Sequence, residues 1–278
     1  MLHAPMVPGS SNPGTVRTSL GGVARNVAQN LARLGCDVLL CSRVGDDDAG
    51  GRVIAQRLDT SLITVSQICP TASYTAVLEP CGELVIGLAD MDVYDELTPA
   101  VLAPTVPRLR EAGLWFLDAN LPAATMAWLL EQAEVPVAAD AVSVAKSPRL
   151  LPLLRRIAYL FCNVAQAAAL SGGLFAGPGG AAEALQALGS RSGIVSAGSA
   201  GIAVYERAGI ALMPALPAAP RDVTGAGDAL VAGTLYGLSQ QRDLRAAARL
   251  GLAAAAIAVE SESSAAPSLT AEALQARV

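Results

Sequence analysis

The chain of 278 residues contains a single histidine, His3, and aromatic residues make up only 4% of it. With one histidine, in a terminus that we expect to be loose, a zinc site or a histidine-dependent catalytic triad has little support. The five cysteines show no CxxC spacing, and we expect them to be buried, reduced thiols that act as small hydrophobic residues. Hydrophobic residues still make up 53% of the chain. Because so few of them are aromatic, aliphatic residues must supply the core.

The sequence also lacks clusters of lysine and arginine, and its formal net charge is −5. Nucleic acid and anionic membranes are therefore not expected as partners. The apolar stretch at residues 250–259 is too short to span a bilayer, and the N-terminus lacks the charged and apolar regions of a secretory signal. We expect a cytoplasmic protein.

From residue 114 onward, short apolar runs alternate with helical stretches. This alternation predicts an α/β fold in which helices cover both faces of a mainly parallel central sheet. No repeat or low-complexity linker divides the chain, so we expect one domain over residues 1–278. The expected strands are residues 114–118, 135–140, 157–163 and 193–197, followed by a hairpin at residues 202–206 and 209–213.

The first part of the chain predicts a helix and a separate hairpin. Apolar residues recur at helical intervals in residues 22–34, just before Gly35. Residues 73–79 and 83–89 have the pattern of two short strands, which must cover something or pair with another chain to be stable. The other expected elements are a strand at residues 37–44, a helix that ends near Leu58, and helices at residues 243–259 and 270–277.

Polar side chains end three of the expected parallel strands: Asp118, with Asn120 just beyond it, Asp140 and Asn163. Ligands of open α/β sheets bind at the carboxyl ends of the strands. Each residue alone could instead cap the helix that follows it. Their convergence on one edge of the sheet favours a binding site.

The most informative segment is Asp-Val-Thr-Gly-Ala-Gly-Asp at residues 222–228, which precedes an apolar helical run. Gly225 and Gly227 let the backbone approach a ligand, and the N–H groups of the first helical turn favour an anion there. Asp228 is placed to accept a proton from a hydroxyl that attacks a phosphoryl group. The segment therefore indicates phosphoryl transfer to an alcohol, although it could also be an ordinary loop in which Asp228 only caps the helix.

A second motif, Gly-Gly-Val-Ala-Arg-Asn at residues 21–26, opens the first expected helix. Gly21 and Gly22 would let a ligand approach the backbone, and Asn26 could bind sugar hydroxyls. A glycine pair before a helix is also a common turn, so this motif is weak alone. Its combination with residues 222–228 indicates a family.

Together the two motifs resemble the signatures of the ribokinase-like (PfkB) carbohydrate and nucleoside kinases, over nearly the whole chain. The resemblance implies a ribokinase-like α/β fold with a small β lid, formed by about residues 10–20 and 71–92. It also implies ATP with Mg²⁺ as the phosphoryl donor and an exocyclic primary alcohol of a small molecule as the acceptor.

The resemblance also implies a role for each matching position. Asp228 is the implied base, and the implied anion hole consists of Gly225, Ala226 and Gly227. The implied substrate contacts are Gly21, Gly22, Asn26, Tyr74, Asn120 and Lys146. The positions that fall near the nucleotide are Asn163, Ser196, Gly198 and Thr224. Asp222 and Thr224 lie where relatives often hold a monovalent cation such as K⁺.

Further segments resemble the pseudouridine kinases within this family: residues 12–17, 72–76, 90–92 and 139–146. The expected activity is phosphorylation of the 5′-hydroxyl of a nucleoside, with pseudouridine as the expected acceptor, by a homodimer paired through the lid. A related kinase for a free sugar such as ribose or fructose is an alternative. A nucleoside-binding protein of the same fold that has lost catalysis is another.

Two features depart from the family pattern. Relatives have Asn-x-x-Glu after the strand that ends at Asn163, and the glutamate helps to hold magnesium and its waters; this chain has Gln166 instead. Glutamine is nearly isosteric but neutral, so we expect weaker, water-mediated binding of magnesium. The first strand of the family, with an aspartate that binds the sugar, is not found in residues 1–13, and we expect it to be missing.

Overall fold

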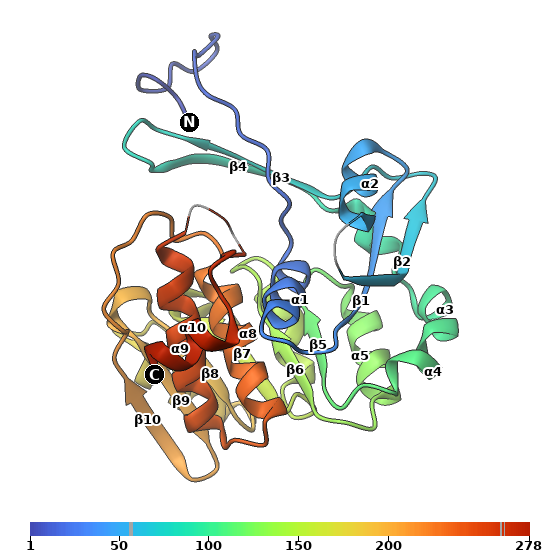
Figure 1. Cartoon of the computed structure of the whole chain (residues 1–278), viewed down its shortest axis with the longest axis vertical. Coiled ribbons are helices and arrows are strands. Elements are labelled where there is room, and N and C mark those ends of the chain that lie inside the picture. Colours follow the sequence, from blue (N-terminus) through green and yellow to red (C-terminus); the bar gives the residue numbers. More distant parts are fainter. Residues whose placement is uncertain (56–57, 262, 264) are drawn as a thin grey trace. The chain divides into compact units, whose positions relative to one another are not determined.

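The structure is a computed structural model that describes residues 1–55, 58–261, 263 and 265–278 (Figure 1). The chain forms two compact units. The first comprises Met1–Leu20, Ser42–Arg57 and Ile63–Glu96, and the second comprises Gly21–Cys41, Leu58–Leu62 and Leu97–Val278. The second unit therefore contains both motifs that indicate phosphoryl transfer.

A six-stranded sheet forms the centre of the second unit, in the order β10-β9-β8-β7-β6-β5. Strands β5 to β8 are parallel to one another, whereas β9 runs antiparallel to β8 and forms a hairpin with β10. The mainly parallel sheet expected from the sequence is therefore confirmed. Its strands are β5 (Trp115–Asp118), β6 (Val137–Asp140), β7 (Tyr159–Asn163), β8 (Gly193–Ser196), β9 (Ile202–Glu206) and β10 (Gly209–Met213).

Aliphatic side chains join this sheet to the helices. Val27 of α1 (Val23–Arg33) and Val231 of α8 (Ala226–Ser239) lie in one buried cluster with Phe161 of β7. Among the described residues, no helix is long and apolar enough to cross a bilayer. The other helices of the unit are α3 (Pro99–Leu102), η2 (Ala103–Thr105), α4 (Val106–Leu109), α5 (Ala123–Gln132), η3 (Ser147–Leu153), α6 (Val164–Ser171), α7 (Pro178–Ala187), η4 (Gly198–Ala200), α9 (Leu244–Val259) and α10 (Ala271–Arg277).

The first unit contains the antiparallel hairpin of β3 (Ser73–Leu78) and β4 (Leu84–Asp90) that the sequence predicts. The N-terminal segment is attached to this hairpin. The N–H of Leu2 donates to the carbonyl of Leu78 at 2.8 Å, and Leu2 also forms an antiparallel bridge with Gly14. The terminus that we expected to be loose is therefore held by backbone hydrogen bonds.

Strand β2 (Asp59–Ser66), which pairs with β1 (Leu39–Gly45), is an element that the sequence did not reveal. The β-branched residues of this segment favour an extended backbone, because their side chains lose rotamer freedom in a helix. Helix α2 (Asp48–Ile54) ends before Leu58, where we expected it to end. Residues 56–57 of that expected helix lie outside the described part of the chain.

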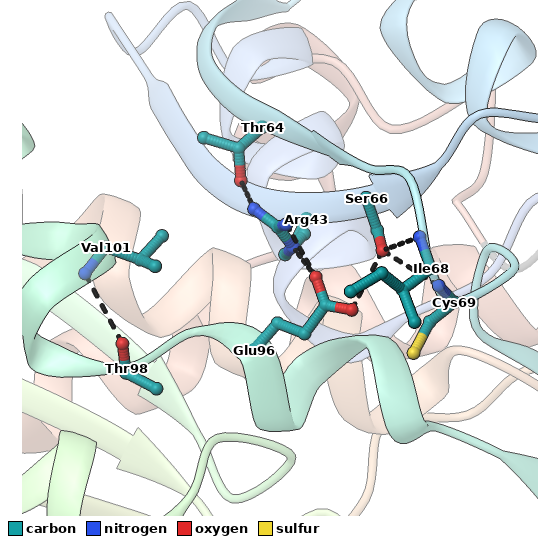
Figure 2. Close-up of polar contacts among 8 residues, drawn as sticks. All are labelled: Arg43, Thr64, Ser66, Ile68, Cys69, Glu96, Thr98 and Val101. Atoms are coloured by element: carbon teal, nitrogen blue, oxygen red, sulfur yellow. Dashed lines mark hydrogen bonds and ion pairs between the residues drawn. The ribbon is translucent and has the colours of Figure 1, made fainter.

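An ion pair joins three segments of the first unit (Figure 2). Arg43 of β1 contacts Glu96, at the end of η1 (Asp92–Glu96), at 2.5 Å, and Arg43 also donates to Thr64 Oγ1 at 3.0 Å. Ser66 Oγ donates to the other carboxylate oxygen of Glu96 at 2.9 Å. The two charged side chains are only 17% and 21% exposed, so solvent screens this pair less than an ordinary surface pair.

The cysteines are free thiols, but only Cys162 among them is buried. It alone lies in a central strand of the six-stranded sheet, where both faces are covered. Cys81 is exposed in the hairpin turn of the first unit, and the other three are partly exposed: Cys36, Cys41 and Cys69. The expectation that all five are buried was therefore wrong for four of them.

Helices α8 and α9 pack closely because glycines lie at their contact. A Cβ atom on Gly237 of α8 would lie 2.6 Å from the Cα of Ala247 in α9. A Cβ atom on Gly233 would lie 2.7 Å from the carbonyl oxygen of Leu250. The two backbones are therefore at a separation that only glycine permits, which fixes the position of α8 in the core.

We expect Gly237→Ala to destabilise the protein by about 1–3 kcal/mol, because the added methyl group overpacks the contact between α8 and α9. Gly51→Ala in α2 is the matched control, since a Cβ atom there would have no neighbour within 4 Å. Alanine is the better helix former, so Gly51→Ala should be stabilising by about 0.5–1 kcal/mol. Chemical unfolding of both variants measures the effects, and equal effects would contradict the close packing of these helices.

Candidate active site

The turn before α8 has the backbone geometry expected of an anion-binding site. Asp222 Oδ1 accepts the N–H of Thr224 at 2.8 Å, and Gly225 follows with φ of 81°, a conformation that favours glycine. The N–H of Ala226 donates within the turn at 3.2 Å. Gly227 lies one residue further into the first helical turn, where N–H groups have no acceptor within the helix. Of the three predicted anion-hole residues, Gly227 lines the adjacent cavity.

The side chain of Asp228 connects the two sequence motifs. Asn26 Nδ2 donates to Asp228 Oδ2 at 2.6 Å, although 202 residues separate them along the chain. Burial raises the pKa of Asp228 to about 7, and the nearby charge of Asp118 acts in the same direction. The hydrogen bond from Asn26 and the charge of Arg25 oppose this rise. A carboxyl group with a pKa near 7 is well matched to accept a proton at neutral pH.

Asp228 lines a cavity of about 130 Å³ at the carboxyl ends of the parallel strands. The cavity contains the polar strand ends that the sequence singles out together with the start of α8. Apolar side chains such as Phe161 and Ile194 form the rest of its wall. The polar residues that the structure brings together here are Asp140, Asn163, Gln166, Ser196 and Asp228.

Asp140 is the second carboxylate of this cavity. Its Oδ1 accepts the N–H of Val142 at 2.7 Å, and Val142 has φ of 61°, which is rare for a β-branched residue. Burial, together with the charges of Asp228 and Asp118, raises the pKa of Asp140 to about 8. The cavity therefore holds two carboxyl groups that both resist ionisation.

Asp118, at the end of β5, holds the start of α1. Its Oδ2 accepts the N–H of Ala24 at 3.1 Å, and its Oδ1 accepts the N–H of Asn120 at 2.9 Å. Gly22, the N-cap residue of α1, has φ of 97° and no side chain that could make such a bond. Asp118 therefore supplies the missing cap from 94 residues away.

Two predicted substrate residues lie next to each other beyond β5. Lys146 Nζ contacts Asn120 Oδ1, and the charge of Lys146 lowers the pKa of Asp118, although burial, the larger effect, raises it. Lys146 is the only lysine in the chain. Arg149 fixes the same loop, because its Nη1 donates to the carbonyls of residues 119–121 at 3.1–3.3 Å.

Gln166 and Asn163 form a reciprocal cap at the start of α6. Gln166 Oε1 accepts the N–H of Asn163 at 2.8 Å, and Asn163 Oδ1 accepts the N–H of Gln166 at 2.9 Å. The amide oxygen of Gln166 is therefore engaged with the backbone, although the side chain lines the cavity. Among the described residues, no group of three or more His, Cys, Asp or Glu side chains could hold a metal ion.

Some predicted residues lie outside the cavity. Gly198, with φ of 56°, begins η4 just after β8, and Thr224 is exposed in the turn before α8. Tyr74 belongs to β3 of the first unit, where it is 58% exposed and its ring lies over Gly87 of β4. The cavity therefore gathers only part of the predicted set.

Arg25 was not predicted as a site residue, and Asp118 and Asp140 were expected at the binding edge of the sheet without an assigned role. The two aspartates carried a signal, because each ends a parallel strand, but a helix cap explained them equally well. Arg25 carried none, since a single arginine in a helix is ordinarily solvated.

The chain matches the family model described as pfkB family carbohydrate kinase over residues 5–271. It is 32% identical over 273 residues to the "Uncharacterized sugar kinase YeiI" of Escherichia coli, which covers 95% of this chain and 75% of that protein. It is also 32% identical over 234 residues to the pseudouridine kinase of Escherichia coli, with 80% of this chain and 74% of that protein covered.

Among solved structures, Arabidopsis thaliana ribokinase complexed with ribose and ATP superposes with a TM-score of 0.86. The match covers 98% of this chain and 92% of that chain at 20% identity, which supports the fold alone. The chain belongs to the pfkB family of carbohydrate kinases and has the ribokinase-like fold. It is accordingly a sugar or nucleoside kinase of this type, a phosphotransferase that uses an alcohol group as acceptor.

The raised pKa of Asp140 predicts a pH-dependent effect on stability. In the unfolded chain this carboxyl group ionises near pH 4, whereas in the folded protein it ionises near pH 8. The folded state therefore binds the proton more tightly, and stability is lost as the pH rises from about 4 to 8. An asparagine side chain cannot ionise, so Asp140→Asn should gain stability relative to the wild type as the pH rises through this range, by up to about 5 kcal/mol for a pKa difference of about four between the two states.

Thermal and urea unfolding at pH 5 and pH 8.5 measure this effect. Asp37→Asn, at an exposed position after α1, is the control for the substitution itself. A stability difference for Asp140→Asn that does not change between the two pH values would contradict the raised pKa.

Proposed function

We propose that the protein is an ATP-dependent kinase that phosphorylates the 5′-hydroxyl of a nucleoside, with pseudouridine as its acceptor. The observation that carries the proposal is the setting of Asp228. Its carboxyl group has a pKa near neutrality, lies in the first turn of α8, and is oriented by Asn26 from the other motif. A base and a cluster of backbone N–H groups at one helix start suit transfer of a phosphoryl group to a hydroxyl.

In this mechanism Asp228 accepts the proton of the acceptor hydroxyl as its oxygen attacks the γ-phosphate. The backbone N–H groups of Gly225 and Gly227 face the negative charge on the transferred group, whereas the N–H of Ala226, the third predicted anion-hole residue, already donates within the turn. The positive end of the α8 dipole acts in the same direction. These groups are fixed before the reaction, so little reorganisation is needed as charge develops.

The acceptor lies against the start of α1 in this proposal. Gly21 and Gly22 allow the sugar to approach the backbone, and Asn26 contacts it beside Asp228. Asn120 and Lys146, which are adjacent in the structure, supply further polar contacts. The E. coli pseudouridine kinase, with its 32% identity, supports pseudouridine over other nucleosides.

The nucleotide occupies the opposite side, near β7 and β8. Asn163 and Ser196 are paired in register at the ends of these strands, and both line the cavity. Gly198 and Thr224 extend this side beyond the cavity. The Arabidopsis ribokinase of the same fold was solved with ATP, which is consistent with this assignment.

Magnesium, when bound, neutralises charge on the phosphates of ATP. The cavity has oxygen donors of the type that magnesium takes, but the amide oxygen of Gln166 already accepts the N–H of Asn163. Gln166 would therefore hold magnesium weakly and through water. Asp222, whose Oδ1 orders the turn, is a candidate ligand for a monovalent cation such as K⁺.

Several expectations from the sequence stay predictions. They are the lid formed by residues 10–20 and 71–92, the contact of Tyr74 with the substrate, a homodimer through the lid, and a cytoplasmic location.

The proposal is tested by ADP release from MgATP with pseudouridine, uridine, ribose and fructose as acceptors. We expect the highest kcat/KM with pseudouridine. Asp228→Asn should lower turnover by roughly 10²-fold or more, as expected for loss of a positioned base, while nucleoside binding is retained. Asp243→Asn is the matched control, because Asp243 only caps α9 and asparagine is an equally good cap.

Other outcomes discriminate between the alternatives. A preference for ribose or fructose would make the protein a sugar kinase, as the similarity to the E. coli sugar kinase also allows. Nucleoside binding without ADP release would identify a binding protein that has lost catalysis. Near-normal turnover of Asp228→Asn would exclude Asp228 as the base.

Gln166→Glu should lower the magnesium concentration needed for half-maximal rate by about threefold or more, because it adds a charged oxygen ligand. One carboxylate oxygen can still accept the N–H of Asn163, which leaves the second oxygen for the cavity. Magnesium titrations of the wild type and the variant measure the change. Gln275→Glu on the exposed face of α10 controls for the added charge, and an equal effect of both substitutions would refute a local role of Gln166.

A further inference from the structure

Arg25 lies between the two motifs of the site, and its side chain is nearly buried, with 8% exposed. Its Nε donates to the carbonyl of Gly21 at 2.8 Å, and its Nη1 donates to Gln29 Oε1 at 2.6 Å. Its Nη2 donates to Asn26 Oδ1. The planar guanidinium group thus links the glycine turn before α1 to the side chain of the next residue.

The contact with Asn26 decides which way that amide faces. Because Arg25 has only donors, it binds the oxygen of the Asn26 amide and leaves the NH₂ group on the side of Asp228. Asn26 Nδ2 then donates to Asp228 Oδ2 at 2.6 Å. The opposite orientation would place the amide oxygen against the carboxylate and an NH₂ group against the guanidinium, so both contacts would become repulsive.

We propose that Arg25 is a positioning residue for the phosphoryl transfer: it locks the amide of Asn26 in the orientation that keeps Asp228 available as a base. The inference rests on the proposed role of Asp228. It adds that one side chain holds both parts of the site. Arg25 donates to the carbonyl of Gly21, in the proposed acceptor-binding turn, and reaches Asp228 through Asn26.

The charges around Asp228 make this role necessary. Asp118 at the end of β5 disfavours the ionised form of Asp228, and Asp140 at the end of β6 also interacts with it electrostatically. The charge of Lys146 acts on Asp118, where it opposes the larger effect of burial on the pKa of that carboxyl group. Arg25 is the cation whose charge opposes the rise in the pKa of Asp228, directly and through Asn26. Without Arg25, burial and the neighbouring carboxylates would raise the pKa of Asp228 further.

Arg25→Met removes the guanidinium group and keeps an apolar side chain of similar length. We expect the acidic limb of the kcat/KM profile for pseudouridine, with MgATP saturating, to move upward by about one pH unit, because an opposite charge and an oriented donor are lost. At pH values below this acidic limb, the kcat/KM of the variant should be about tenfold lower than that of the wild type. Above pH 9 the two values should become similar. A purely structural defect would instead lower activity by the same factor at every pH.

Arg33→Met is the matched control. Arg33 lies on the same helix and donates to the carbonyl of Ala265, and its charge is not among those that shift the pKa of Asp228. This variant should leave the acidic limb unchanged. A ¹³C NMR titration of the Asp228 carboxyl, assigned with Asp228→Asn, reports the same ionisation in the free enzyme without relying on turnover.

The possible results separate the inference from the proposed function. An acidic limb that is unchanged in Arg25→Met, with an unchanged NMR titration, overturns the role of Arg25 alone. Absence of turnover with every acceptor overturns the proposed function, and the NMR titration still decides whether Arg25 acts on Asp228. If Arg25→Met does not fold, Arg25→Lys replaces it: the ammonium group keeps the charge but lacks the planar fork that donates to Gly21 and Asn26 at fixed positions, so a smaller upward shift is expected, and no shift refutes the proposal.

Discussion

The structure of the site depends on the cost of burying carboxylates close to one another. Asp118, Asp140 and Asp228 lie within reach of one another's charges at one edge of the sheet. Each accepts hydrogen bonds or faces a cation: Ala24 of α1 and Lys146 for Asp118, the N–H of Val142 for Asp140, and Asn26 and Arg25, also of α1, for Asp228. Helix α1 therefore meets two of these carboxyl groups, and each group either accepts hydrogen bonds or resists ionisation in the buried site.

Much of this arrangement could be read from the sequence, because its signals are local. Alternating apolar runs indicate the parallel sheet, and Asp243 and Thr270 mark the starts of α9 and α10. The carboxyl ends of parallel strands lie at the same edge of a sheet. Asp140 and Asn163 could therefore be placed at that edge before their contacts were known. The glycines of residues 222–228 likewise predict the turn before α8.

The remaining features could not be predicted, because they arise from contacts between distant segments. The cap of α1 comes from Asp118, whereas the local sequence offers only Gly22. The amide oxygen of Gln166 accepts the N–H of Asn163. Gln166 therefore differs from the glutamate of relatives in two ways, because it lacks the charge and its oxygen is already engaged. The exposure of Cys81 and the partial exposure of three other cysteines follow from their positions outside the central strands, which composition alone does not reveal.

The remote cap on α1 also has a consequence for the order of folding. A helix whose first turn is capped by its own N-cap residue can gain that stability as soon as it forms. Helix α1 gains this stability only after β5 has formed and Asp118 has reached Ala24, because 94 positions of sequence separate the two residues. The segment that carries Asn26 and Arg25 therefore gains this cap only once a strand far along the chain is in place.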